Sequence, residues 1–198
     1  MLKYTEIITQ IISLMERAEE SEINDPNAAT LATADKKGRP SLRVVLVKKV
    51  DPEDHFVFFT NENSRKGQDL LSNPYAALNF HWKTLGRQIR IEGEVVKIAS
   101  EESNAYFATR SRGSQIGAWA SNQSSPMSDR QEIIARYEEI EKKYDGQEVP
   151  RPPYWNGFRV IPDSIEFWQE GEYRLHQRDV YKPEDEPREY WQRILLNP

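Results

Sequence analysis

The strongest structural constraint in this sequence is a pair of apolar segments separated by a short turn. Residues 42–50 read Leu-Arg-Val-Val-Leu-Val-Lys-Lys-Val, and residues 55–61 form a second run rich in phenylalanine. Between them lies Asp-Pro-Glu-Asp, a combination typical of turns. Because β-branched and aromatic residues favour extended backbone, the two segments predict an antiparallel hairpin.

Shorter segments of the same kind recur along the chain. We expect further strands at 30–34, 75–81, 88–98, 155–161, 164–169, 174–181 and within 189–196. No Gly-x-Gly-x-x-Gly turn links a strand to a helix, which disfavours a dinucleotide-binding Rossmann fold. The pattern predicts a mainly β protein with flanking helices, of the α+β class, built on an antiparallel barrel.

Two helices are predicted on either side of the hairpin. Residues 5–20 place isoleucine and leucine at helical spacing. After the hairpin, Asn63 or Ser64 is a candidate N-cap, and Arg65 and Lys66 fall in the first turn. Cations oppose the helix dipole there, so they indicate either an anion bound at that end or two solvated surface charges. We interpret the pair as a candidate phosphate site.

Two more helices are predicted in the second half of the chain. One spans residues 100–110, with Ser100 as its N-cap. The other lies within 128–146 and opens with a capping box of Ser128 and Gln131. We expect its apolar stripe to pack against the body, through Ile133, Ile134, Tyr137, Ile140 and Tyr144. The small, polar segment 113–125 is expected to be a loop.

Length and composition exclude several classes of protein. With 198 residues, the chain is expected to form one domain, 1–198, with its N-terminal helix within 1–24. A net charge of -5 disfavours binding nucleic acid through a broad basic surface. Cysteine is absent, which excludes disulfides and thiolate metal sites, and we expect no metal site. No apolar run reaches the length of a membrane span, so we expect a cytoplasmic protein with no membrane partner.

Arg174, His176 and Arg178 alternate along the strand predicted at 174–181. A strand has a period of two, so all three side chains would share one face. That face would combine two fixed positive charges with an imidazole that titrates near neutral pH. The alternative is a solvated edge strand, whose charges prevent aggregation.

A second candidate group lies on and after the helix predicted at 100–110. Tyr106 and Arg110 are four residues apart and share a helix face, and Ser114 follows in the connection. Their hydroxyls and guanidinium are suited to a phosphate, although the trio alone is weak evidence. Arg43 and Lys48 are five residues apart, so a regular strand would put them on opposite faces. A bulge, or a ligand that wraps around a strand edge, would be needed for both to contact one small molecule.

Taken together, the motifs resemble those of the pyridoxine (pyridoxamine) 5'-phosphate oxidase family. The resemblance runs from about residue 27 to about residue 181, in the family's order. It is carried by the blocks Arg43–Lys48, Phe59–Asn61, Ser64–Lys66, Arg87–Gln88, Arg112–Trp119, Gln123–Ser125, Gly157–Val160, Glu166–Trp168 and Arg174–His176.

The resemblance implies a split β-barrel that binds FMN and works as a homodimer, with active sites across the subunit interface. It implies oxidation of pyridoxamine 5'-phosphate or pyridoxine 5'-phosphate, the phosphorylated B6 vitamers, to pyridoxal 5'-phosphate, with O2 reoxidising the flavin. The FMN-binding positions would be Arg43, Val44, Lys48, Phe59, Thr60, Arg65, Lys66, Gln88, Gln123, Ser124, Trp168 and Arg178. The substrate-binding positions would be Lys48, Tyr106, Arg110, Ser114, Arg174 and His176, and Arg174 and His176 would be catalytic.

The sequence departs from the family pattern at three places. Phe59 stands where tyrosine is common, the segment before the barrel is short, and the usual Arg-Leu-x-Pro near the end becomes Leu-Leu-Asn-Pro. Two other functions remain open. One is a related FMN oxidase with another substrate, such as a phenazine-biosynthesis oxidase. The other is a non-catalytic protein that binds FMN or pyridoxal phosphate.

Overall fold

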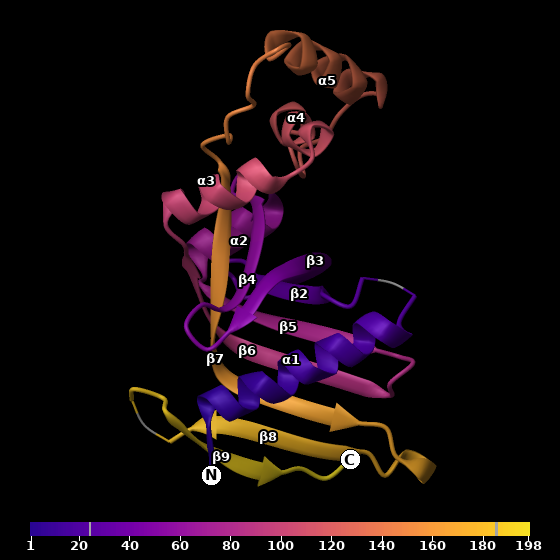
Figure 1. The fold of residues 1–198 in the computed structure, drawn as a ribbon, viewed down its shortest axis with the longest axis vertical. Coiled ribbons are helices and arrows are strands. Elements are labelled where there is room, and N and C mark those ends of the chain that lie inside the picture. Colours follow the sequence, from indigo (N-terminus) through magenta and orange to yellow (C-terminus); the bar gives the residue numbers. More distant parts are fainter. Residues whose placement is uncertain (24, 185) are drawn as a thin grey trace.

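The computed structural model describes residues 1–23, 25–184 and 186–198 (Figure 1). Its helices are α1 (Tyr4–Ser21), α2 (Arg65–Ser72), α3 (Ser100–Thr109), α4 (Arg112–Ala120) and α5 (Gln131–Lys143), with a 3-10 turn at Glu172–Arg174. Its strands are β1 (Leu2–Lys3), β2 (Ala28–Ala34), β3 (Pro40–Asp51), β4 (His55–Asn61), β5 (Tyr75–Trp82), β6 (Arg87–Lys97), β7 (Trp155–Gln169), β8 (Gln177–Pro183) and β9 (Tyr190–Leu195). No helix among these residues combines the length and apolarity that crossing a membrane requires.

The strands form a closed antiparallel barrel with an extension at one edge. The hydrogen-bonded order is β1-β9-β8-β7-β4-β3-β2-β5-β6, and β6 pairs again with β7. This second pairing closes a ring of β7, β4, β3, β2, β5 and β6, which leaves β8, β9 and β1 outside it. The predicted antiparallel barrel with flanking helices is therefore confirmed.

Strand β7 holds the barrel and its extension together. Its first half pairs with β4, its second half pairs with β8, and β6 pairs along most of its length. The two strands predicted at 155–161 and 164–169 are thus one continuous strand. The register of β6 against β7 shifts between Glu92 and Gly93. At Gly93 a Cβ would lie 2.0 Å from the carbonyl oxygen of Ile161, so only glycine allows the strands to approach this closely.

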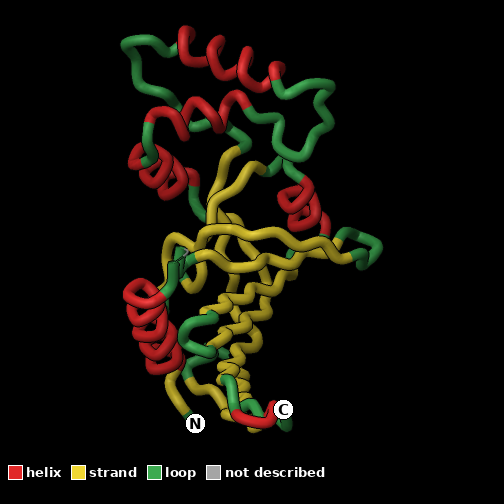
Figure 2. Tube along the Cα trace, turned by 90° about the vertical axis from the view of Figure 1, so that its right-hand side faces the viewer, coloured by secondary structure: helices red, strands yellow, loops and turns green. Residues whose placement is uncertain are grey.

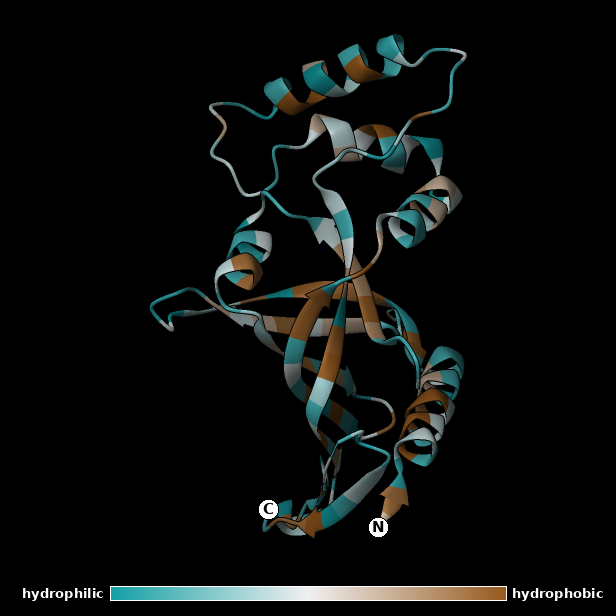
Figure 3. Cartoon of the chain, turned by 90° about the vertical axis from the view of Figure 1, so that its left-hand side faces the viewer, coloured by the Kyte–Doolittle hydropathy of each residue, from teal (hydrophilic) through white to brown (hydrophobic). Residues whose placement is uncertain are grey.

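The barrel interior is filled by apolar side chains, among them Phe56, Phe58, Phe80, Ile91 and Val160, all fully or nearly fully buried. Helix α1 adds a second layer, because its Ile7, Ile8 and Ile11 are completely buried in the same cluster. Figure 3 shows the hydrophobic residues concentrated along the barrel strands, while the outer loops are mostly hydrophilic.

Helices α2 to α5 gather at the opposite end of the molecule from β8 and β9 (Figures 1 and 2). The loop predicted at 113–125 is wrong in its first half, because residues 112–120 form α4. Ile116 and Ala120, one turn apart, are buried there and stabilise the helix despite its two glycines.

The helix predicted within 128–146 is present but shorter and more exposed than expected. It begins at Gln131, and Ser128 hydrogen-bonds Glu132, so the predicted capping box with Gln131 is wrong. No residue of α5 is buried, because this helix packs mainly on α4. In α3, similarly, the N-cap is Ala99 and Ser100 is the first helical residue.

The strand predicted at 174–181 begins only at Gln177. The preceding residues make a 3-10 turn in which Tyr173 and Arg174 have φ angles of 55° and 66°. Gly171 allows this turn to fold back, since a Cβ there would lie 2.2 Å from the carbonyl oxygen of Leu175. The prediction that Arg174, His176 and Arg178 share one strand face is therefore wrong, because Arg174 and His176 both precede the strand and only Arg178 belongs to it.

Candidate functional site

A cavity of about 460 Å³ opens between the side of the barrel and the helices at its end. Strands β3 and β4, helices α2, α3 and α4, the loop after α4 and the start of β7 all contribute to its wall. Nine of the predicted site residues line it, namely Val44, Lys48, Phe59, Thr60, Lys66, Tyr106, Arg110, Ser114 and Gln123. The structure thus brings together residues that lie up to about 80 positions apart in the sequence. Such residues become neighbours because the order of strands in the sheet differs from their order in the chain.

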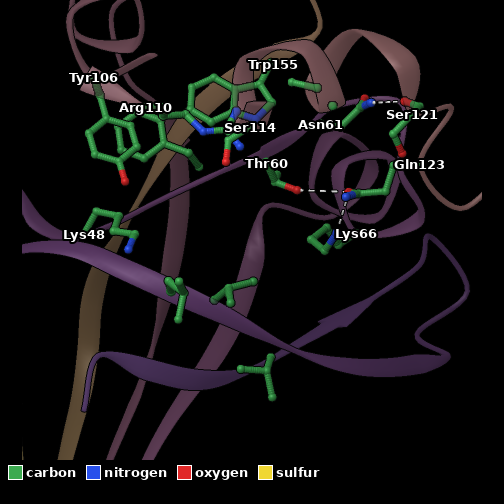
Figure 4. A pocket seen from close by; sticks show the side chains of 16 residues that line it. Lys48, Thr60, Asn61, Lys66, Tyr106, Arg110, Ser114, Ser121, Gln123 and Trp155 are labelled. Carbon is green, nitrogen blue, oxygen red and sulfur yellow. Dashed lines mark hydrogen bonds between the residues drawn. The ribbon is translucent and has the colours of Figure 1, made fainter. Parts of the chain in front are cut away.

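One side of the cavity is formed by the N-terminus of α2. Ser64 caps the helix by accepting from the backbone N–H of Gly67 at 3.4 Å, which confirms one of the two predicted caps. Lys66 Nζ donates to Gln123 Oε1 at 2.9 Å, and the Thr60 hydroxyl donates to the same oxygen at 3.4 Å. In Figure 4, Thr60, Lys66 and Gln123 converge on this side.

Positive charge is concentrated around this helix end. Burial lowers the pKa of Lys66, and the neighbouring charge of Arg43 lowers it further. Burial likewise lowers the pKa of Arg43, with Arg65 adding to the effect and Asp69 opposing it. Positive charges gathered beside the backbone N–H groups of the first helical turn create a field that favours a bound anion.

Arg43 itself does not line the cavity. Its guanidinium donates to the hydroxyls of Thr33 at 2.7 Å and Ser41 at 2.9 Å. Thr33 in turn donates to the buried carboxylate of Asp69 at 2.7 Å. Arg43 therefore links β2 to β3 through its hydrogen bonds, and its ion pair with Asp69 at 3.8 Å places its charge beside α2.

The opposite side of the cavity has an aromatic wall. Phe59 stacks on Tyr106 with ring centroids 4.0 Å apart and planes 14° apart. Phe59 also stacks on Trp155 at 5.2 Å and 9°. The guanidinium carbon of Arg110 lies 4.8 Å from the centre of the Trp155 ring. The phenylalanine that departs from the family pattern thus contributes its ring to a stack of three aromatic side chains.

Arg110 is the side chain of this wall that is best suited to bind an anion. Its Nη1 is buried and has no hydrogen-bond partner within the described part of the chain. Burial lowers the pKa of Arg110, and the nearby Tyr106 opposes that shift. A buried guanidinium N–H without an acceptor is costly. Lys48, Tyr106 and Ser114 lie around Arg110 in Figure 4, so hydroxyl and ammonium donors accompany the guanidinium.

Strand β3 has a bulge at Lys48. Val47 pairs with Phe58 and Lys49 pairs with Val57, so Lys48 is an extra residue in β3. Lys48 reaches the cavity, whereas Arg43 points to the other side of the strand.

Sequence reasoning missed Trp155, Asn61 and Ser121, which also line the cavity. Trp155 lies directly opposite Asn61 in the pairing of β7 with β4. The available signal was an aromatic residue at the first position of a strand, two residues after a Pro-Pro pair.

The remaining predicted residues lie elsewhere. Arg65 and Ser124 are exposed and do not line the cavity. A second group forms on the barrel extension, where Gln88, Trp168 and Arg178 face one another across β6, β7 and β8. His176 packs on Trp168 with ring centroids 4.6 Å apart, and its Nδ1 accepts from the backbone N–H of Gly171 at 3.2 Å. Arg174 is exposed in the adjoining turn.

A closed antiparallel barrel with a cation-rich, aromatic-walled cavity defines a barrel protein suited to an anionic ligand. Its sequence matches the family model of pyridoxamine 5'-phosphate oxidase over residues 15–144. It also matches the model of the pyridoxine 5'-phosphate oxidase C-terminal dimerisation region over residues 155–198. The chain therefore belongs to the pyridoxamine 5'-phosphate oxidase family, a family of oxidoreductases.

Similar proteins agree with this assignment. A pyridoxine/pyridoxamine 5'-phosphate oxidase of Myxococcus xanthus (strain DK1622) is 53% identical over 178 residues, which cover 90% of this chain and 86% of the relative. One from Paraburkholderia phytofirmans is 50% identical over 189 residues, with 96% and 87% covered.

Two solved structures share the fold. PhzG from Burkholderia lata 383, in complex with tetrahydrophenazine-1-carboxylic acid, has a TM-score of 0.89 at 31% identity and covers 98% of this chain and 93% of its own. A pyridoxamine 5'-phosphate oxidase-related, FMN binding protein from Nostoc punctiforme has a TM-score of 0.74 at 17% identity, with 96% of each chain covered.

Proposed function

We propose that this protein is an FMN-dependent oxidase that converts pyridoxamine 5'-phosphate and pyridoxine 5'-phosphate to pyridoxal 5'-phosphate, with O2 as electron acceptor. The observation that supports the proposal is that two separate groups of cationic and hydrogen-bond-donating side chains lie at one cavity. One is the cationic N-terminus of α2, and the other surrounds the unpartnered Nη1 of Arg110. A flavin mononucleotide and a phosphorylated substrate each carry one phosphate.

The residues fit this pair of ligands. Arg65, Lys66 and the backbone N–H groups of α2 would bind the FMN phosphate, with Thr60 and Gln123 beside it. Lys48, Tyr106, Arg110 and Ser114 would bind the substrate phosphate. FMN, when bound, supplies the redox chemistry that oxidises the C4' carbon of the substrate.

We infer that the second group of residues completes the cavity of a partner subunit. Trp155 and Trp168 lie 13 residues apart on β7, a contour length of about 40 Å. The first half of β7 stands beneath α3 and the second half lies beside β8 (Figure 1). One chain therefore holds the two groups at different places, whereas a second copy can bring them together.

An exposed apolar strip supports such an interface. Leu42 and Val44 on β3 are 72% and 65% exposed, and Leu46 continues the strip into the cavity wall. Apolar side chains in a contiguous row on a strand face are typical of surfaces that another protein covers. The match to the family's dimerisation region covers β7, β8 and β9, and Trp168 and Arg178 of the second group lie on the first two of these strands.

In the proposed dimer, Arg174 and His176 orient the pyridine ring of the substrate. Because the Gly171 N–H donates to His176 Nδ1, the neutral imidazole carries its proton on Nε2. That nitrogen can donate a hydrogen bond to a polar substituent of the ring. Arg174, exposed on a tight turn, supplies a fixed positive charge beside it. Holding the reacting carbon in one orientation accelerates the reaction without any covalent role for the protein.

The proposal is tested by absorbance spectroscopy of the purified protein. Pyridoxamine 5'-phosphate is added without oxygen, and air is then admitted. We expect the flavin bands to bleach, to recover in air, and to be accompanied by a growing pyridoxal phosphate signal. Bands that do not bleach with either phosphorylated vitamer would contradict the proposed substrates. Bleaching by tetrahydrophenazine-1-carboxylic acid instead, the compound bound in the PhzG structure, would favour a phenazine-type substrate.

A further inference from the structure

A buried carboxylate lies directly beside the second group of residues. In the pairing of β6, β7 and β8, one row across the sheet is Gln88, Trp168 and Arg178. The next row is Arg90, Glu166 and Val180. Side chains two residues apart on a strand point the same way, so both rows face the same side of the sheet. Glu166 is only 3% exposed there.

Both oxygens of Glu166 are engaged by arginines from the flanking strands. Arg178 donates from Nε to Oε1 at 2.7 Å and from Nη2 to Oε2 at 3.1 Å. Arg90 Nη2 lies 2.7 Å from Oε2. A buried carboxylate is tolerated when charged partners satisfy it in this way. The two-point contact with Arg178 fixes both the position and the plane of its guanidinium.

The consequences for Arg178 are visible in its other contacts. Its hydrogen bond with Glu166 is the main reason that its pKa is raised. Its Nη1 donates to the carbonyl oxygen of Asn197 at 3.3 Å, and its backbone carbonyl accepts from Leu196 at 3.0 Å. Arg178 is thus fixed beside Trp168 by two kinds of contact. The Glu166 carboxylate binds its guanidinium, and Leu196 and Asn197 bind Arg178 through their backbone.

We propose that Glu166 is a positioning residue for FMN binding, acting through Arg178. This inference rests on the proposed function, with Gln88, Trp168 and Arg178 as the FMN-binding positions that the family resemblance implies. Without Glu166, the Arg178 side chain regains several rotamers and loses a fixed orientation, which must be restored each time FMN binds. The competing explanation is that Glu166 only ties β6, β7 and β8 together, as a cross-strand ion pair.

The experiment is a double-mutant cycle on FMN affinity. The apoprotein is prepared for wild type, Glu166→Gln, Arg178→Ala and the double variant, and the Kd for FMN is measured by quenching of flavin fluorescence. We expect Glu166→Gln to raise the Kd about ten-fold, the effect of losing one oriented charged contact. In the Arg178→Ala background, Glu166→Gln should change the Kd less than two-fold, because a residue that acts through Arg178 is non-additive with it.

Asp179→Asn is the matched control. Asp179 is also a buried carboxylate on β8, bonded to Gln177 and Arg193, but its side chain points to the other face from Arg178. We expect this variant to lose thermal stability while keeping its FMN affinity. An equal loss of FMN affinity in Asp179→Asn and Glu166→Gln would overturn the positioning role, and so would an additive double mutant.

A second variant keeps the test decisive if Glu166→Gln does not fold. Glu166→Asp retains the charge but shortens the side chain by one methylene, so that the two-point contact with Arg178 cannot form. It is expected to fold and to bind FMN more weakly, and a wild-type Kd would overturn the inference. Wild-type protein that binds no FMN would instead refute the proposed function itself, which separates the two failures.

Discussion

Lys66 Nζ and Gln123 Oε1 are 2.9 Å apart, which joins the first turn of α2 to the loop that follows α4. The two residues are far apart in sequence and come together at the cationic side of the cavity. We expect the double variant Arg65→Ala/Lys66→Ala to raise the Kd for FMN about 10- to 100-fold, because two contacts of roughly 1.5 kcal/mol or less each are lost. Flavin fluorescence quenching on the apoprotein measures this.

The control for that prediction is Lys36→Ala/Lys37→Ala, which removes the same charge from an exposed turn. We expect it to change FMN affinity little at physiological ionic strength, where distant surface charges are screened. If both double variants lose affinity equally, the α2 terminus is not a specific phosphate site.

Removal of the Arg110 charge should affect stability and ligand binding in opposite directions. Arg110→Met replaces a buried guanidinium that lacks one partner, so we expect the free energy of unfolding of the ligand-free protein to stay equal or to rise by about 1 kcal/mol. The KM for pyridoxamine 5'-phosphate should rise at least ten-fold. Inorganic phosphate should raise the melting temperature of wild type more than that of the variant, and an equal shift in both would contradict the assignment.

Mixing two inactive variants tests whether each active site is shared between subunits. Arg110→Met damages the cavity, and Arg174→Leu damages the second group. In a two-fold dimer, half of randomly mixed dimers are heterodimers with one intact site each, so about a quarter of wild-type activity should return. Turnover measured after unfolding and refolding the mixture checks this. A mixture that remains inactive would place both groups in the same chain's site.

Gly67 is required by the close approach of α2 to the preceding turn. A Cβ at this position would lie 2.3 Å from the carbonyl oxygen of Glu62. We expect Gly67→Ala to destabilise the protein by about 2–3 kcal/mol, because the helix must shift away from rigid backbone. Gly117→Ala on α4 is the comparison, since nothing lies within 4 Å of its Cβ. That substitution should stabilise the protein by about 0.5–1 kcal/mol. Urea denaturation of both variants measures the difference.

His55 makes stability depend on pH. It hydrogen-bonds Tyr4 at 2.8 Å. Burial lowers its pKa from the ordinary 6.5, Arg159 and Arg188 lower it further, and Asp51 and Asp54 oppose them. The unfolded chain therefore binds the proton more tightly, so stability should fall as pH drops below about 6.5 toward the pKa of the folded state.

The variant His55→Asn isolates this contribution. Asparagine tolerates the φ angle of 58° at position 55, and it does not titrate. Melting temperatures measured between pH 8 and pH 5 should fall less steeply for the variant than for wild type. Parallel curves would show that other groups set the acid sensitivity.

Features that depend on local chemistry were predictable from the sequence. The hairpin of β3 and β4 follows from its β-branched residues and turn, and the start of α2 follows from Ser64 as a cap. Helix α4 was missed because Gly113, Gly117 and Ser114 have low helix propensity, although Ile116 and Ala120 have helical spacing. Tertiary burial decided the conformation there.

The candidate site was predictable in its membership but not in its geometry. Residues around the cavity were identified by their chemistry and by the family resemblance. Their division into two groups depends on the order of strands in the sheet, which periodicity does not reveal. The turn at Tyr173 and Arg174 was missed for a related reason. The alternation of Arg174, His176 and Arg178 is compatible with a strand, and nothing in it signals two successive positive φ angles.

Strand β7 has a consequence for the dimer as a whole. It begins at Trp155 in the wall of one cavity and ends just after Trp168, which in the proposed dimer serves the other cavity. The length of β7 would then determine the distance between the two catalytic centres. Any substitution that shifts β7 along its own axis would disturb both centres at once. Each chain would thereby transmit strain from one centre to the other through continuous backbone, without an intervening hinge.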